Sequence, residues 1–333
     1  MMSEARIVTA DTLFSGSGNV LQKLKANDWN IDKALRTNAT LPKDAWSAMD
    51  SAIIEVAGQR LNGIADLQSR NLTRDLRSGG LGILYDYWQT MSEGGDAEQS
   101  MSGITAGAEN TLDFDEQAIP LPITFVDFRI PIRKLIAMQK YGTPFDTTMV
   151  SQATRKVIEK LEDCLFNGSS VKVGGRSLYG YMNYPYSNEL STLSGDWTGT
   201  PANIEPDVVK LIAAAEADRH YGPYILYVHS NEWTDLRQRD STADRTYFDI
   251  VMSMKGIEDI KTTDALSAND IALVEMSRET IDLDVAVDIK VVEWDTHGGM
   301  QSNFKIMAVI APRVKSDYDG RCGVVYDTDI GSS

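Results

Sequence analysis

The chain has 333 residues, of which 42% are apolar, so it can bury one large core or two smaller ones. Its formal net charge of -16 disfavours a dedicated nucleic-acid binder, because phosphate contacts require clustered lysine and arginine. Two cysteines, Cys164 and Cys322, are too few for a disulfide framework and fit a reducing cytoplasm. No apolar run approaches the roughly 18 residues that a membrane span needs.

The first part of the chain divides into an arm and a helical segment. Residues 1–40 mix serine, glycine, asparagine and threonine with scattered apolar residues, which predicts an extended arm with little core of its own. A helix start signal follows at Leu41-Pro42-Lys43-Asp44, and apolar residues then keep helical spacing to about Leu67. We therefore expect an N-terminal helix within residues 41–77.

A long hairpin is expected over residues 78–132. A strand pattern follows Gly79-Gly80, residues 92–110 have the composition of a loop, and an alternating strand returns from Leu121 to Ile132. Pro131 in the returning strand indicates a position at a sheet edge. A two-stranded hairpin of this length and glycine content is marginally stable by itself, so we expect it to contact a partner.

Charge is unevenly distributed around this hairpin. Residues 81–127 contain nine acidic and no basic side chains, whereas residues 128–163 contain seven basic and four acidic ones. An acidic hairpin could therefore seat on the basic surface of a neighbouring molecule. The same pattern also fits a solvated acidic loop, and the sequence leaves both interpretations open.

A long amphipathic helix follows the hairpin. Asp146 fits the N-cap position, and Asn167-Gly168 supplies the left-handed stop at the other end. Between them, apolar residues recur at three- and four-residue steps and form one stripe of Val150, Ala153, Val157, Leu161 and Cys164.

The rest of the chain predicts a second core. Residues 169–205 are loop-rich, and Pro206 then opens a helix that begins a helix and strand series reaching Val274. A hairpin around His297-Gly298-Gly299 and a last strand at residues 323–326 complete the chain.

Three stretches, in collinear order over roughly residues 110–315, resemble the encapsulin and bacteriophage major-capsid group, which shares the Hong Kong 97-type shell fold. The first runs from Pro120-Leu121-Pro122-Ile123 through the long helix to Glu162, Asp163, Phe166 and Gly168. The other two are Gly222-Pro223-Tyr224 with the helix opener Ser230-Asn231-Glu232-Trp233, and Ile260 to Leu266 leading into Ile271 to Val274.

The resemblance implies an α+β Hong Kong 97-type fold. Its parts are an N-terminal arm (1–40), an N-terminal helix (41–77), an extended loop hairpin (78–132), a peripheral domain with a long spine helix (133–205 and 301–333) and an axial domain (206–300). It also implies that the hairpin lies across a neighbouring subunit. The residues expected at assembly contacts are Tyr85, Tyr87, Trp88, Arg129, Arg133, Arg155 and Lys156.

No catalytic, cofactor-binding or metal site is predicted. His220, His229 and His297 show no pairing at ligand spacing, and the adjacent acids Asp113-Phe114-Asp115-Glu116 are interpreted as solvated charge. Asp317-Tyr318-Asp319-Gly320 lacks the later ligands of a calcium loop and is interpreted as a turn. Some capsid proteins of this group form an isopeptide cross-link from a lysine on the extended loop. Residues 81–127 contain no lysine, so that cross-link is not expected.

We therefore expect a bacteriophage major capsid protein that assembles into an icosahedral head of hexamers and pentamers. The head would enclose double-stranded DNA without binding it specifically, form in the host cytoplasm, and have portal, scaffold or decoration proteins as partners but no membrane. An encapsulin nanocompartment enclosing a cargo enzyme is the second hypothesis, and the long arm and loop favour the phage capsid over it. The third hypothesis is a soluble acidic hydrolase with an unrecognised site.

Overall fold

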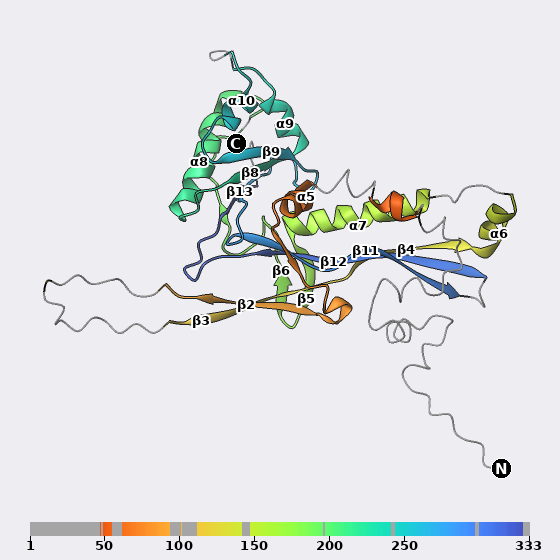
Figure 1. Ribbon diagram of the computed structural model, residues 1–333. Coiled ribbons are helices and arrows are strands. Elements are labelled where there is room, and N and C mark those ends of the chain that lie inside the picture. Colours follow the sequence, from red (N-terminus) through yellow and green to blue (C-terminus); the bar gives the residue numbers. More distant parts are fainter. Residues whose placement is uncertain are drawn as a thin grey trace, which may run out of the picture.

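The computed structural model describes residues 47, 49–54, 62–93, 101, 112–141, 147–195, 197–240, 244–296 and 300–328. Within them, two β-sheets with associated helices form the body, and a two-stranded hairpin projects from it (Figure 1). The arm predicted for residues 1–40, most of the hairpin tip and the turn at residues 297–299 lie outside the described residues.

The first sheet has four strands, in the order β1 (Thr73–Asp75), β11 (Ile281–Thr296), β12 (Gln301–Val314) and β4 (Thr124–Pro131). β4 lies at the edge, which confirms the prediction from Pro131, whose missing N–H is not needed there. Helix α7 (Thr148–Asn167) packs along one face of this sheet (Figure 1). Alternate residues of β4 join the core on that face, and Phe128 stacks on Phe304 with 5.1 Å between ring centroids.

Helix α7 confirms the predicted long helix. Val150, Ala153, Val157 and Leu161 are buried, as the three- and four-residue spacing requires. The helix ends at Gly168, which has a φ of 69°, and a Cβ there would lie 2.6 Å from the carbonyl oxygen of Leu178. The predicted N-cap, Asp146, lies outside the described residues. No helix in the described part of the chain is long and apolar enough to cross a membrane.

The second sheet has five strands, in the order β7 (Asn188–Glu189), β13 (Val324–Asp327), β10 (Ile271–Glu275), β8 (Tyr224–Val228) and β9 (Ile257–Thr262). Every residue of β8, β10 and β13 is buried, which explains their nearly continuous apolar sequence. One face packs on α8 (Ile204–Ala217), α9 (Ser230–Leu236) and α10 (Tyr247–Met252). The other face joins the core of the first sheet.

The projecting hairpin consists of β2 (Tyr85–Met91) and β3 (Phe114–Pro120), and the small hairpin of β5 (Ser169–Val173) and β6 (Arg176–Leu178) contacts β3. Two short helices lie beside the first sheet's helix and strand, α5 (Asn62–Ser69) beside α7 and α6 (Ile132–Tyr141) after β4. Residues 49–54 are also helical, and Met49 and Ile53 are buried in the core. Residues 80–82 and 201–203 form 3-10 turns.

Local structure differs from the sequence prediction in three places. Residues 80–82 form a turn and not the start of a strand, which lets Leu81 pack on Val292 and Met307 of the first sheet. The strand predicted to reach Ile132 ends one residue earlier, where α6 begins. β1 was not predicted, because a strand of three residues is too short to show a period.

Two strands belong to a different sheet from the one that their predicted domain implies. β11, assigned by sequence to residues 206–300, pairs with β1 and β12 and so belongs to the first sheet. β13, assigned to residues 301–333, pairs with β10 and β7 in the second sheet. The physical reason is that hydrogen bonding on both sides fixes each strand in its sheet, whereas sequence order does not reveal which strands are neighbours.

Candidate functional site

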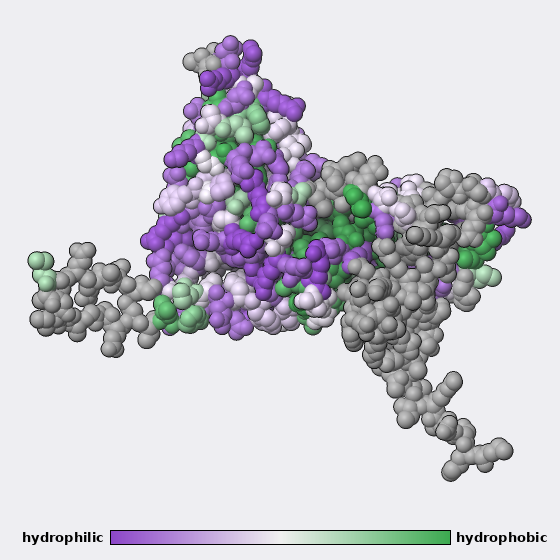
Figure 2. Space-filling model, in the orientation of Figure 1, coloured by the Kyte–Doolittle hydropathy of each residue, from purple (hydrophilic) through white to green (hydrophobic). Residues whose placement is uncertain are grey.

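The outward face of the hairpin carries three exposed apolar side chains beside the polar pair Gln89 and Glu116. β2 and β3 pair in register from Tyr85 with Pro120 to Met91 with Phe114, so Tyr87, Met91 and Phe114 share one face. These three side chains are 53%, 54% and 62% exposed. Figure 2 shows apolar surface at the outer end of the described hairpin. More than half of each of these three side chains is therefore left uncovered by the described chain.

The inward face anchors the hairpin to its own subunit. Trp88 and Ile119 pack against Val309 and Ala311 of β12. The Arg313 guanidinium lies 5.2 Å from the centroid of the Trp88 ring, a cation–π contact. Trp88 is predicted as an assembly contact, which stays a prediction; within the chain it holds the hairpin base to the first sheet.

A buried network of charges lies beneath the same strand. Asp86 accepts a hydrogen bond from Arg313 Nη1 at 2.8 Å and another from Arg74 Nη1. Arg313 also donates to both oxygens of Asp282, at 2.6 and 2.5 Å, and Lys315 donates to Asp282 at 2.6 Å. Burial alone would raise the pKa of Asp282, but these donors hold it below its ordinary value.

The predicted basic contacts lie elsewhere on the molecule. Arg129 is on β4, Arg133 on α6, and Arg155 and Lys156 on α7, and all four side chains are exposed. Lys156 pairs with Glu159 at 2.7 Å, whereas no ion pair joins the three arginines to any described residue. The hairpin and α6 project at opposite ends of the subunit, so the structure does not bring the two groups of contacts together within one chain (Figure 1).

The acidic side chains of the hairpin divide into two groups. Asp86 and Glu93 have partners within the subunit, the latter 2.9 Å from Arg219. Asp113, Asp115 and Glu116 form no ion pair with a described residue. The first group therefore supports the hairpin, and only the second is available to a neighbour.

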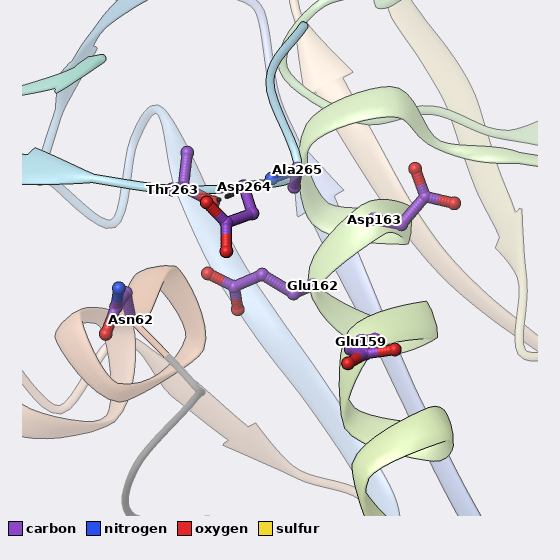
Figure 3. A pocket seen from close by; sticks show the side chains of 7 residues that line it. All are labelled: Asn62, Glu159, Glu162, Asp163, Thr263, Asp264 and Ala265. Carbon is purple, nitrogen blue, oxygen red and sulfur yellow. Dashed lines mark hydrogen bonds between the residues drawn. The ribbon is translucent and has the colours of Figure 1, made fainter. Parts of the chain in front are cut away.

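A hollow of about 610 Å³ lies between α5, α7 and the end of β9 (Figure 3). Its lining is mostly acidic and amide in character and comprises Asn62, Glu159, Glu162, Asp163, Thr263, Asp264 and Ala265. Glu162 points from α7 toward α5 (Figure 3) and accepts hydrogen bonds from the backbone N–H groups of Gly63 at 2.7 Å and Ile64 at 3.4 Å. Burial raises the pKa of Glu162 to about 7 in spite of these hydrogen bonds.

This contact explains the family-like pattern that ends α7. Glu162 therefore accepts hydrogen bonds in the first turn of α5, as an N-cap side chain does. Phe166 packs edge-on against Tyr181 and Tyr227, with centroids 5.3 and 5.1 Å away, and Gly168 allows the close turn that follows. These residues hold α5, α7 and the second sheet together, so their role in the described structure is packing.

One exposed cluster, Glu93, Asp317 and Asp319, has metal-ligand spacing among the described residues. Arg321 lies within 3.5 Å of each of the three carboxylates, at 3.5, 3.4 and 3.1 Å, and neutralises part of their charge. Residues 317–320 form the predicted turn, with Gly320 at a φ of 82°.

Solved structures with the same architecture are shell proteins. A virus-like particle from Pyrococcus furiosus matches with a TM-score of 0.62 at 13% identity, over 84% of this chain and 98% of that one. The capsid of Myoviridae phage XM1 matches with a TM-score of 0.58 at 14% identity, over 78% and 90%. A chain of Mycobacterium phage Bobi gives 0.54 at 14% identity, over 76% and 88%. No protein with a curated description matches the sequence.

These likenesses define the class: the chain has the Hong Kong 97-type fold of capsid shell proteins, which confirms the predicted α+β architecture. Within that class, residues 34–327 match a family of unknown function (DUF6260), and the chain belongs to that family.

Sequence reasoning missed the charged network beneath the hairpin. A signal for it was present, because Asp282 and Asp284 alternate with Ile281, Leu283 and Val285 in an apolar strand. That alternation indicates a strand with one charged face, but the donors to Asp282 are Arg313 and Lys315, and Arg313 also links Asp282 to Asp86. Only the fold brings these distant positions together.

Proposed function

We propose that this protein is a major capsid protein whose copies assemble into an icosahedral shell of pentamers and hexamers around double-stranded DNA. The observation that carries the proposal is the projecting hairpin, on which Tyr87, Met91 and Phe114 stay more than half exposed in the described chain. The shell fold of its structural neighbours supports the same conclusion. Burying the exposed aromatic and methionine side chains against a neighbour would supply the stability that the ribbon lacks.

The charges of the hairpin indicate which surface of a neighbouring subunit it contacts. Asp113, Asp115 and Glu116 of one subunit can meet Arg129 and Arg133 of another, because the two groups lie at opposite ends of one chain. A single exposed ion pair contributes only about 0.2–1 kcal/mol, so its effect on one contact is small. In a closed shell the same contact repeats around every subunit, and small differences add up to a large change in assembly.

Charge reversal tests this contact. We expect the pair Asp115→Lys and Glu116→Lys, and separately the pair Arg129→Glu and Arg133→Glu, to reduce the yield of closed particles in electron microscopy and to make assembly more sensitive to salt. Combining all four changes should restore particles. Glu279→Lys is the matched control, because Glu279 is exposed and lies in the turn before β11, not on β3, β4 or α6. A clean monomer for the wild-type protein on a sizing column would refute the shell and favour a soluble acidic enzyme.

Cargo separates the capsid from its closest alternative. An encapsulin-type compartment enclosing an enzyme is favoured by the virus-like particle as a structural neighbour. Particles from the native source that protect DNA from nuclease support the capsid proposal, and particles that copurify with one stoichiometric protein support the compartment. We place the capsid in the virion, assembled in the host cytoplasm, with portal, scaffold or decoration proteins as its partners.

A further inference from the structure

Asp284 is a buried carboxyl group without a hydrogen-bond partner. It lies on β11 next to Arg74 of β1 in the parallel register, and its side chain has 0% exposure. Neither of its carboxyl oxygens accepts a hydrogen bond from a described residue. Buried polar atoms in proteins are nearly always paired, so this group requires an explanation.

The donors around Asp284 are already used by other carboxylates. Arg313 gives Nε and Nη2 to Asp282 and Nη1 to Asp86. Lys315 also donates to Asp282, and Arg74 donates to Asp86. The charged groups that face Asp284 are therefore Arg74 of β1, Asp86 of β2, Asp282 of β11, and Arg313 of β12 with Lys315 just beyond it.

An ionised Asp284 is unfavourable in this position. It would be a third negative charge in a dry site, beside Asp86 and Asp282, without a donor of its own. Burial raises its pKa from 3.8 to about 7, the two neighbouring carboxylates add to the rise, and Arg313 and Arg74 only partly oppose it. At mildly acidic pH the carboxyl group therefore keeps its proton while the hairpin base covers it.

We propose that Asp284 is a proton-operated latch for the hairpin: with its proton, β2 stays docked on the first sheet, and loss of the proton favours release of β2. When β2 lifts, water reaches Asp284 and the group ionises with its ordinary acidity. Acid therefore favours the docked position and neutral or alkaline pH favours the lifted one. Asp86 and Trp88 are the parts of β2 that move, because both contact Arg313 beside Asp284.

The pH window follows from proton linkage. A carboxyl group with a raised pKa stabilises the docked state fully below its ordinary pKa, and this contribution is lost as pH rises to about 7. Over that interval the equilibrium constant for docking falls by at most about tenfold per pH unit. Asp282 acts in the opposite direction, because its lowered pKa removes its support only in strong acid. Between about pH 5 and pH 7, Asp284 therefore determines how the docking of β2 depends on pH.

The latch regulates the hairpin to which the proposed function assigns the subunit contacts, so its importance for assembly rests on that proposal. The docking equilibrium itself belongs to the single chain. Hydrogen exchange of the β2 amides, residues 85–91, measures it directly in subunits separated from particles by sizing. After correction for intrinsic exchange, we expect opening of β2 to increase by up to about tenfold per unit from about pH 5 to pH 7.

Substitutions identify the group responsible. Asp284→Asn mimics the protonated form and should leave β2 docked, so that the opening of β2 does not change between about pH 5 and pH 7. Glu162→Gln is the matched control, because Glu162 also titrates near neutral pH but caps α5, so the β2 slope should persist. A wild-type slope in Asp284→Asn, or no slope in the wild type, overturns the proposal.

An independent measurement covers the case in which Asp284→Asn does not fold. In the Glu162→Gln background, the infrared carbonyl band of a buried protonated carboxyl group should be present at about pH 6 and fade above about pH 8. Absence of that band refutes the latch. Failure to form particles in electron microscopy would refute the proposed function and leave both of these results unchanged.

Discussion

Replacing Glu162 with glutamine should stabilise the protein at alkaline pH and change little in acid. Glu162 is 6% exposed and caps α5 through the N–H groups of Gly63 and Ile64. Burial raises its pKa from 4.5 to about 7. Because the folded pKa is the higher one, the contribution of this group to stability is fully present below about pH 4.5 and is lost as pH rises to about 7.

The size of the effect follows from that interval. From 4.5 to about 7, at about 1.36 kcal/mol per pH unit, the ionised Glu162 costs the folded state about 3 kcal/mol at alkaline pH. Glutamine keeps an acceptor for the N–H of Gly63 and carries no charge, so the variant avoids this loss. For 333 residues with an unfolding entropy of ~2.1 cal/mol/K each, the gain corresponds to a rise in Tm of about 4 °C.

Calorimetry of dissociated subunits at about pH 5 and pH 8 measures the difference. Glu162→Ala is the control, because it removes the acceptor and leaves the N–H of Gly63 unsatisfied. It should be less stable than the glutamine variant at both pH values, by about 1–2 kcal/mol, because it loses the hydrogen bond and likewise carries no charge. If the glutamine variant melts no higher than the wild type at alkaline pH, or gains equally at both values, the reasoning from burial is wrong.

Three further predictions concern the C-terminal end of α7, the hairpin base and the partly buried His220. Gly168→Ala should lower the free energy of unfolding by about 3 kcal/mol, because the φ is 69° and the new Cβ would lie 2.6 Å from a carbonyl oxygen of β6. Gly175→Ala is the control, with a φ of 80° but open space around the new Cβ, and should cost only about 1 kcal/mol. Denaturant titrations measure both. Trp88→Ala should speed hydrogen exchange of β2 even in subunits that do not assemble, because Trp88 packs within its own chain; unchanged exchange would assign it to assembly alone. The hydrogen bond with Glu275 raises the pKa of His220 above 6.5, so the stability that it contributes is present in acid and lost as pH rises through that raised value. His220→Gln should remove this part of the pH dependence of stability. A profile of stability against pH that is identical to the wild type's would contradict the assignment.

Local patterns predicted the elements that one segment can specify. The apolar stripe of α7, its glycine stop and the edge position of β4 all follow from spacing and residue type, and the structure confirms them. The 3-10 turn at residues 80–82 and helix α6 were missed, because short elements carry too little periodicity and their conformation depends on what they pack against.

The sequence shows the charge pattern of the hairpin but not what each carboxylate contacts. The sequence showed nine acidic residues between positions 81 and 127 and no basic one. It could not show that Asp86 is buried against Arg313 while Asp113, Asp115 and Glu116 have no ion-pair partner among the described residues. The difference arises because a partner 227 positions away decides which carboxylates support the subunit.

The sequence by itself determined individual helices, strands and turns, because their periods act locally, and it indicated the class of fold through the resemblance of three collinear stretches to the capsid group. Only the tertiary structure decided the sheet to which β11 and β13 belong, the capping of α5 by Glu162 and the burial of Asp284 without a donor. Each of these depends on contacts between segments far apart in the chain. Hydrogen bonds and desolvation act over a few ångströms of space, whatever the separation in sequence.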